Sequence, residues 1–151
     1  GSKSPEPDRP RLVKRLIGVP GDRISMDTKQ LTINGEPLEY EWRNEVEFIQ
    51  TQRGMQEFRR GVEHLPGREH ALMIYPDRDD PIRKHMAELV VPDGQYFVMG
   101  DNRDDSKDSR YFEGTFVDRD LIEGRAFAVA LSFDYANRWK PRWGRWFSGL
   151  E

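Results

Sequence analysis

The chain has 151 residues and a formal net charge of −3, so it can bury one domain-sized core but lacks the basic excess of a nucleic-acid-binding protein. It contains no cysteine, which excludes disulfide bonds and thiolate metal sites. No apolar run approaches the roughly 18 residues that a membrane-spanning helix needs. Frequent glycine and proline, together with 34% charged residues, favour a loop-rich β protein.

The first ten residues predict a linker. Gly1-Ser2 is typical of an expression scar, and prolines at positions 5, 7 and 10 favour an extended segment over a helix. Short runs of alternating polar and apolar residues follow, and they predict strands over residues 11–19, 23–27, 30–33 and 36–40.

Two turn signals separate these strands. Pro20-Gly21-Asp22 combines a proline that presets φ with a glycine that accepts a positive φ. Asn34-Gly35 is the strongest hairpin signal in the chain, because a two-residue hairpin turn needs positive φ.

The middle of the chain gives weaker signals. A strand is predicted around Phe48, whereas residues 52–60 are polar and fit either a loop or an edge strand. Pro66-Gly67 predicts a second hairpin, with strands over residues 62–65 and 70–75.

Residues 76–81 are rich in proline and aspartate and predict a loop, after which the remaining elements follow. One or two helical turns are predicted within residues 82–89, and a further helical turn at 118–122. Strands are predicted over residues 95–99, 115–117 and 126–133.

Residues 99–112 are the most unusual stretch, because acids, bases and hydroxyls alternate there with almost no apolar residue. Either a solvated loop or a site built from an Asp/Arg/Ser network would have this composition. A calcium loop starting at Asn102 is disfavoured, because Lys107 stands where such a loop needs glycine and because a strand precedes it.

The histidines predict neither a metal site nor a histidine-based catalytic site. The three present, His64, His70 and His85, do not have the spacing of a zinc site. None lies near a nucleophile-elbow pattern, which disfavours a Ser-His-Asp triad. We therefore expect no metal and no cofactor.

Lys14 lies in an apolar strand between Val13 and Arg15. Burial and the neighbouring positive charge of Arg15 would both favour the neutral amine, which can take a proton from a serine hydroxyl. The alternative is a surface lysine whose stem covers apolar groups while its ammonium reaches water.

Residues 139–147, near the end of the sequence, alternate aromatic and cationic side chains. Two interpretations fit it: core packing with exposed arginines, or a patch that meets anionic lipid at the headgroup level. The aromatic candidates for membrane contact are Trp139, Trp143, Trp146 and Phe147.

Two of these stretches together resemble a known family. Gly-Asp-Asn-Arg-Asp-Asp-Ser-Lys-Asp-Ser-Arg-Tyr-Phe, residues 100–112, closely resembles the last signature box of bacterial type I signal peptidase, a membrane-anchored Ser/Lys protease. Residues 12–22 resemble an earlier box, in the family's order, and the segment after the last box, through residues 131–134, is also similar. The resemblance implies a mostly β, antiparallel catalytic domain over 11–41 and 90–151, with a smaller inserted β subdomain over 42–89.

The resemblance also implies roles for individual residues. Lys14 matches the general base, and Ser106 matches the hydroxyl that orients its amine. The matching supporting network consists of Arg15, Asp101, Asn102, Asp108 and Arg110, of which Asp108 and Arg110 match an ion pair. We therefore predict that the Lys14 amine lies within hydrogen-bond reach of Ser106.

The activity that the resemblance implies is removal of N-terminal signal peptides, ending in Ala-x-Ala, from exported preproteins. Its place would be the extracytoplasmic, periplasmic face of the bacterial cytoplasmic membrane, in contact with lipid. The family's nucleophile lies in a Ser-Met-x-Pro box before the lysine box, and Ser25-Met26 does not match it. We therefore expect a partial catalytic domain that is inactive alone.

Two rival functions fit the same residues. A related Ser/Lys peptidase that processes pilins would share the chemistry. A non-catalytic β module could instead bind peptides along an exposed strand edge.

Overall fold

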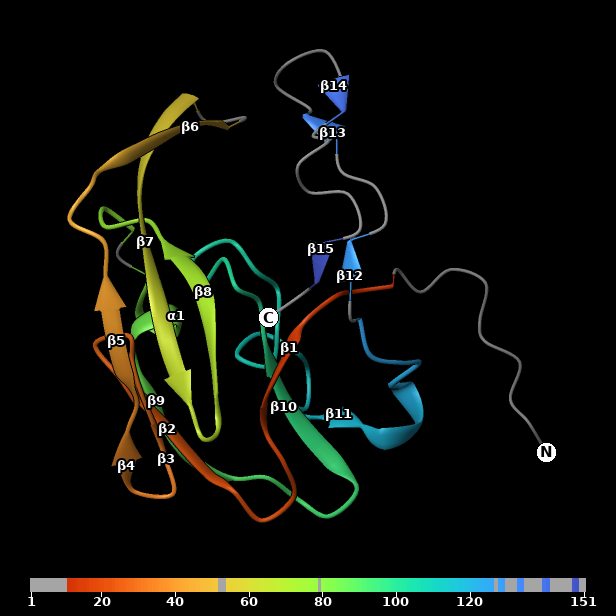
Figure 1. The fold of residues 1–151 in the computed structure, drawn as a ribbon. Coiled ribbons are helices and arrows are strands. Elements are labelled where there is room, and N and C mark those ends of the chain that lie inside the picture. The colour runs from red at the N-terminus through yellow and green to blue at the C-terminus, as the bar shows by residue number, and fades with distance from the viewer. Residues whose placement is uncertain are drawn as a thin grey trace.

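We describe the fold from a computed structural model, in which residues 11–51, 54–78, 80–126, 128–129, 133–134, 140–141 and 148–149 are placed well enough to describe. The described elements are nearly all strands, which confirms the predicted mostly β class (Figure 1). Every pair of named strands is antiparallel. Among these residues, no helix has the length and apolar character needed to cross a membrane.

One sheet places the first strand beside a strand from much later in the chain. Its order is β1 (Arg15–Gly18), β10 (Gln95–Met99) and β11 (Val117–Asp118). Arg15 pairs with Met99 and Leu16 with Val98, but the register shifts before Gly18, which pairs with Phe97. Ile17 is therefore an extra residue in β1, a β-bulge.

A second sheet begins with the predicted hairpin. Its order is β4 (Glu36–Pro37), β3 (Gln30–Ile33), β2 (Arg23–Asp27) and β9 (Met86–Val90). At the β3–β4 turn Asn34 and Gly35 have φ of 54° and 88°, as a two-residue hairpin turn requires. The predicted turn at Pro20-Gly21 is also present, with Gly21 at φ 89°.

A third sheet is built around one long strand. β7 (Gly54–Leu65) pairs with β5 (Glu39–Trp42) and β6 (Glu47–Thr51) on one side and with β8 (Arg68–Ile74) on the other. Figure 1 shows the β6–β7 ribbon reaching away from the body of the protein. Two short pairs, β12 (Ala128–Val129) with β15 (Ser148–Gly149) and β13 (Phe133–Asp134) with β14 (Lys140–Pro141), follow.

The sequence-based expectations for the elements are met in part. The stretch 54–60 belongs to β7, and its residues 54–58 pair only with β6, so the edge-strand alternative is confirmed there, whereas residues 59 and 60 pair with β8. The predicted return strand 36–40 is divided between β4 and β5, because Leu38 turns into the core and donates its N–H to the carbonyl of Leu31 at 2.8 Å.

Of the one or two helical turns expected within 82–89, the structure has one. The helix α1 (Pro81–Lys84) is a single turn capped by Asp80, whose Oδ1 accepts the N–H of Ile82 at 3.0 Å. The chain then becomes β9, because its pairing with β2 provides hydrogen bonds that a second helical turn would lose.

Toward the end of the chain, the predicted helical turn at 118–122 matches the 3₁₀ turn η1 (Arg119–Leu121). The expected strand 115–117 starts later, at Val117. Within the expected strand 126–133, β12 and β13 pair with different partners, and residues 127 and 130–132 lie outside the described residues.

The main core lies where the first two sheets meet. Its fully buried members include Ile24 and Leu31 from one sheet and Phe97 and Met99 from the other. Burying a side chain of this size stabilises a fold by about 1.5–3 kcal/mol. Gly18 allows the sheets to approach, since a Cβ there would lie 2.2 Å from the Cδ1 of Ile24.

Candidate active site

Lys14 and Ser106 meet as predicted. Lys14 lies just before β1 and is half-buried, and its Nζ donates a hydrogen bond to the Oγ of Ser106 at 2.8 Å. Ser106 is buried, with 5% of its surface exposed, and is separated from Lys14 by 92 positions in the sequence. The contact confirms the predicted geometry.

The pairing of β1 with β10 creates this contact. Because Arg15 pairs with Met99, Lys14 lies next to Gly100, where the chain leaves β10 and enters the polar box, residues 100–112. A Cβ on Gly100 would lie 2.2 Å from the Oγ of Ser106 and 3.6 Å from the Nζ of Lys14. Any side chain at position 100 would therefore displace Ser106 from the amine.

The predicted ion pair of Asp108 and Arg110 lies beneath Ser106. Asp108 is fully buried, and the Arg110 side chain is 2% exposed. The Arg110 Nε and Nη2 donate to the two Asp108 oxygens at 2.9 and 2.8 Å, and the Gly100 N–H donates to the same carboxylate at 3.0 Å.

Burial by itself would raise the pKa of Asp108, but hydrogen bonds from Arg110, the Gly100 N–H and the Ser106 hydroxyl hold it below its ordinary value. Because the Ser106 hydroxyl donates to Asp108, the Ser106 oxygen is available to accept from Lys14. The ion pair therefore determines how Ser106 is oriented.

The other predicted network members are also close to the pair. The Arg15 Nε and Nη2 donate to the two oxygens of Asp101 at 2.7 and 2.9 Å. Asn102 forms a parallel bridge with Met73 of β8, and its Nδ2 donates to the Tyr75 hydroxyl at 3.4 Å. The box is thus held against β1 on one side and β8 on the other.

A second buried group beside the box was not singled out from the sequence. Glu63 of β7 is fully buried and accepts two hydrogen bonds from the guanidinium of Arg103, one of them at 2.6 Å. Its Oε2 also lies 2.8 Å from the Nε2 of His70, its cross-strand neighbour on β8.

The environment of Glu63 shifts its pKa strongly. Burial would raise the pKa, but the contacts with His70 and Arg103 outweigh burial and lower it to about 2 from an ordinary 4.5. Burial and the Glu63 charge raise the pKa of Tyr40, which borders the same group.

Asp104 and Ser109 are further buried residues of the box whose roles the sequence analysis did not identify. The Oδ2 of Asp104 accepts from the Lys29 Nζ at 2.7 Å and from the Tyr75 N–H at 2.8 Å. Ser109 exchanges hydrogen bonds with the backbone of Val98, at 2.9 and 3.1 Å. A polar box after a buried strand indicates that such partners exist but does not identify them.

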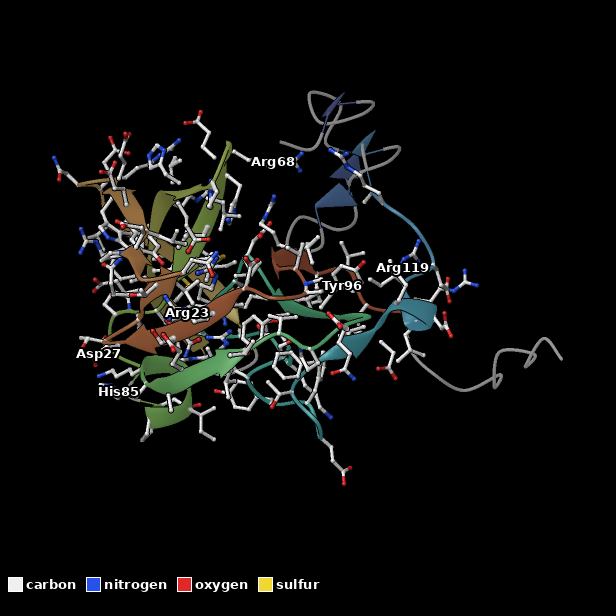
Figure 2. The ribbon with its side chains drawn as sticks, turned by 90° about the horizontal axis from the view of Figure 1, so that it is seen from below. Arg23, Asp27, Arg68, His85, Tyr96 and Arg119 are labelled. Carbon is white, nitrogen blue, oxygen red and sulfur yellow. The ribbon has the colours of Figure 1, made fainter. Side chains whose placement is uncertain are left out.

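The remaining candidate residues do not join this site. His85 forms an exposed pair with Asp27 at 2.7 Å, and both are labelled in Figure 2. Within the described part of the chain, no group of three or more His, Cys, Asp or Glu residues could hold a metal ion. The aromatic membrane candidates Trp139, Trp143, Trp146 and Phe147 lie outside the described residues.

Comparison with known proteins identifies the family. The model of the family described as "Signal peptidase, peptidase S26" matches residues 2–131. Signal peptidase I of Pseudomonas aeruginosa is 34% identical over 84% of this chain and 46% of its own length. Signal peptidase I of Haemophilus influenzae is 30% identical over 92% of this chain and 44% of its own length, and Signal peptidase I S of Bacillus subtilis is 34% identical over 76% and 49%.

The chain therefore belongs to the S26 family of signal peptidases. It spans less than half of the length of these curated relatives.

Removing either partner of the Asp108–Arg110 pair should destabilise the fold. Asp108→Ala or Arg110→Ala leaves a buried charge unpaired, which we expect to cost about 3 kcal/mol of the free energy of unfolding. Urea denaturation of each variant measures this cost. Glu113→Ala, which removes an exposed carboxylate of the same loop, is the control and should have little effect. Equal midpoints for Asp108→Ala and Glu113→Ala would contradict the buried pair.

Glu63 should make stability depend on pH in the acid range. Because its pKa is lowered from 4.5 to about 2, its stabilising contribution is complete above pH 4.5 and is lost as the pH falls toward 2. The loss should be on the order of 3 kcal/mol. Urea denaturation between pH 6 and pH 3 should show a shallower pH dependence for Glu63→Gln, whereas the exposed Glu36→Gln should retain the parent slope. A parent-like slope in Glu63→Gln would place the acid sensitivity elsewhere.

Proposed function

We propose that the chain is part of a serine endopeptidase that removes signal peptides from exported preproteins, with Lys14 as its general base. The observation that carries the proposal is the 2.8 Å hydrogen bond from Lys14 to the buried Ser106, in a chain that belongs to the signal peptidase family.

The geometry suits a lysine that accepts a proton. A neutral amine has two hydrogens and one lone pair, so a hydrogen bond donated to Ser106 holds the nitrogen in place and leaves its lone pair available to accept a proton from a second hydroxyl. The guanidinium of Arg15 donates two hydrogen bonds to Asp101. It therefore remains next to Lys14 without occupying the Lys14 amine.

The proposed reaction then follows the general course of Ser/Lys catalysis. A serine hydroxyl gives its proton to the Lys14 amine while its oxygen attacks the carbonyl carbon of the scissile peptide bond. The Lys14 ammonium next gives that proton to the leaving amine as the C–N bond breaks. Lys14 then takes a proton from water as the water oxygen attacks the acyl carbon, and it returns that proton to the serine oxygen as the bond between this oxygen and the acyl carbon breaks.

We propose that the attacking serine belongs to a Ser-Met-x-Pro box, and no such box occurs among the 151 residues. Ser25-Met26 lies in β2 and is followed by Asp27 and Thr28. Ser106, although close to Lys14, also donates to Asp108 and serves as the orienting hydroxyl. The 151 residues alone should therefore be inactive.

The surface next to Lys14 fits a partner with apolar side chains. Leu12, Val13 and Leu16 flank the lysine and have 53%, 81% and 47% of their surface exposed. We propose that this surface faces the rest of the catalytic domain and a signal peptide that ends in Ala-x-Ala. The place of action would be the extracytoplasmic face of the bacterial cytoplasmic membrane.

The activity can be tested in a longer protein that also contains the Ser-Met-x-Pro box. It should release the mature product from a precursor with an Ala-x-Ala site, and Lys14→Ala should abolish this release because no base remains. Lys107→Ala is the matched control, since it removes an exposed lysine next to Ser106 and should leave cleavage intact. Cleavage that survives Lys14→Ala would refute the Ser/Lys mechanism. Cleavage by the 151 residues alone would refute the proposal that the attacking serine is not among them.

The proposed lipid contact can be tested separately through tryptophan fluorescence. Anionic vesicles should shift the emission of Trp139, Trp143 and Trp146 to shorter wavelengths, and the shift should weaken in high salt because screening reduces attraction to the neighbouring arginines. Replacing the three tryptophans by tyrosine, which leaves Trp42 as the internal reference, should remove the shift. An unchanged spectrum of the parent with anionic vesicles would rule out the contact.

A further inference from the structure

His70 is enclosed by hydrogen-bond acceptors. It lies in β8 with a fully buried side chain, and its Nε2 is 2.8 Å from the Oε2 of Glu63 on β7. Its Nδ1 is 3.1 Å from the carbonyl oxygen of Ala71 and 3.6 Å from the Oδ1 of Asp101 in the polar box.

The contacts of both ring nitrogens favour a ring that donates from each of them. The two hydrogen bonds from the Arg103 guanidinium keep the Glu63 carboxyl ionised, so Glu63 can only accept hydrogen bonds. The Ala71 carbonyl can only accept as well. A neutral imidazole has one donor nitrogen and one bare nitrogen, so in this buried side chain a lone pair would face an acceptor. The doubly protonated ring satisfies both contacts.

His70 then completes a row of alternating charges that ends next to Lys14. Glu63 lies between Arg103 and His70 and contacts both. His70 in turn faces Asp101, which accepts hydrogen bonds from the guanidinium of Arg15. Arg15 directly follows Lys14 in the chain. Tyr40 also borders Glu63, so the charged and titratable groups around His70 belong to β5, β7, β1 and the box.

The backbone strengthens the same connection. The Met73 N–H of β8 donates to the Asp101 carbonyl at 2.9 Å, and the Arg103 N–H donates to the Met73 carbonyl at 3.0 Å. The Arg110 Nη2 donates to the Arg103 carbonyl at 2.7 Å, which joins this connection to the Asp108 pair beneath Ser106. The β7–β8 hairpin therefore contacts both the Arg15 side and the Ser106 side of the site.

We propose that His70, held as an imidazolium between Glu63 and Asp101, is a positioning residue for the Lys14–Ser106 pair. It acts through Asp101 and Arg15 and does not touch the reacting groups. This inference rests on the proposed function, because it assigns His70 a part in the reaction that Lys14 would carry out.

The protonation state can be measured without any activity. With ¹⁵N-labelled histidine rings, both nitrogens of His70 should show the shifts of N–H groups at pH 7. Only three histidines are present, so His64→Gln and His85→Gln assign the signals by elimination. A bare nitrogen in His70 at pH 7 would overturn the imidazolium.

The positioning role requires kinetics of the longer, active protein. His70→Gln keeps a donor toward Glu63 but loses the donor toward Asp101, so kcat should fall on the order of tenfold while KM changes by less than about twofold. His70→Asn, which keeps the opposite donor, should retain more of kcat. His64→Gln, a partly exposed histidine of β7, should behave as the parent.

A double-mutant cycle separates positioning from a general structural effect. If His70 acts through Asp101, His70→Gln should lower kcat by less than about twofold in an Asp101→Asn background. Additive losses, or a parent-like kcat in His70→Gln while Lys14→Ala is inactive, would overturn the positioning role. Cleavage that survives Lys14→Ala would instead refute the proposed function and leave the NMR result for His70 standing.

Discussion

The pairing of β1 with β10 is the constraint on which the site depends. It places Lys14 beside the exit of β10, where Gly100 leaves room for Ser106 to reach the amine. The same two strands contribute Ile17, Phe97 and Met99 to the core. Packing of the core and placement of the amine therefore depend on one set of backbone hydrogen bonds.

Burial of charge is the second organising feature. Glu63, Asp104 and Asp108 are fully enclosed, and each accepts hydrogen bonds from a cationic side chain, Arg103, Lys29 and Arg110 respectively. Such pairs stabilise little in net terms, because desolvation offsets most of the attraction. Their geometry is strict, however, and a polar box held in this way can present Ser106 in one orientation.

The sequence predicts those parts of the structure that depend on local chemistry. Asn34-Gly35 identifies the β3–β4 hairpin through its positive φ values, and the resemblance of two boxes predicts the Lys14–Ser106 contact. The full length of β7 was missed, because its first half is polar and does not alternate regularly between apolar and polar residues. The Glu63–His70 pair was missed because the partner of a buried charge depends on cross-strand register, which the sequence does not show directly.

The bulge at Ile17 has a consequence for how β1 can vary. Side chains of a regular strand alternate between its two faces, so the face of one residue determines the face of every other residue in the strand. The extra residue interrupts this alternation between Leu16 and Gly18. The part of the chain that precedes the bulge, from Lys14 to Leu16, and the part that fills the core can therefore change their side chains independently, because a change in one part does not alter the face that the other presents.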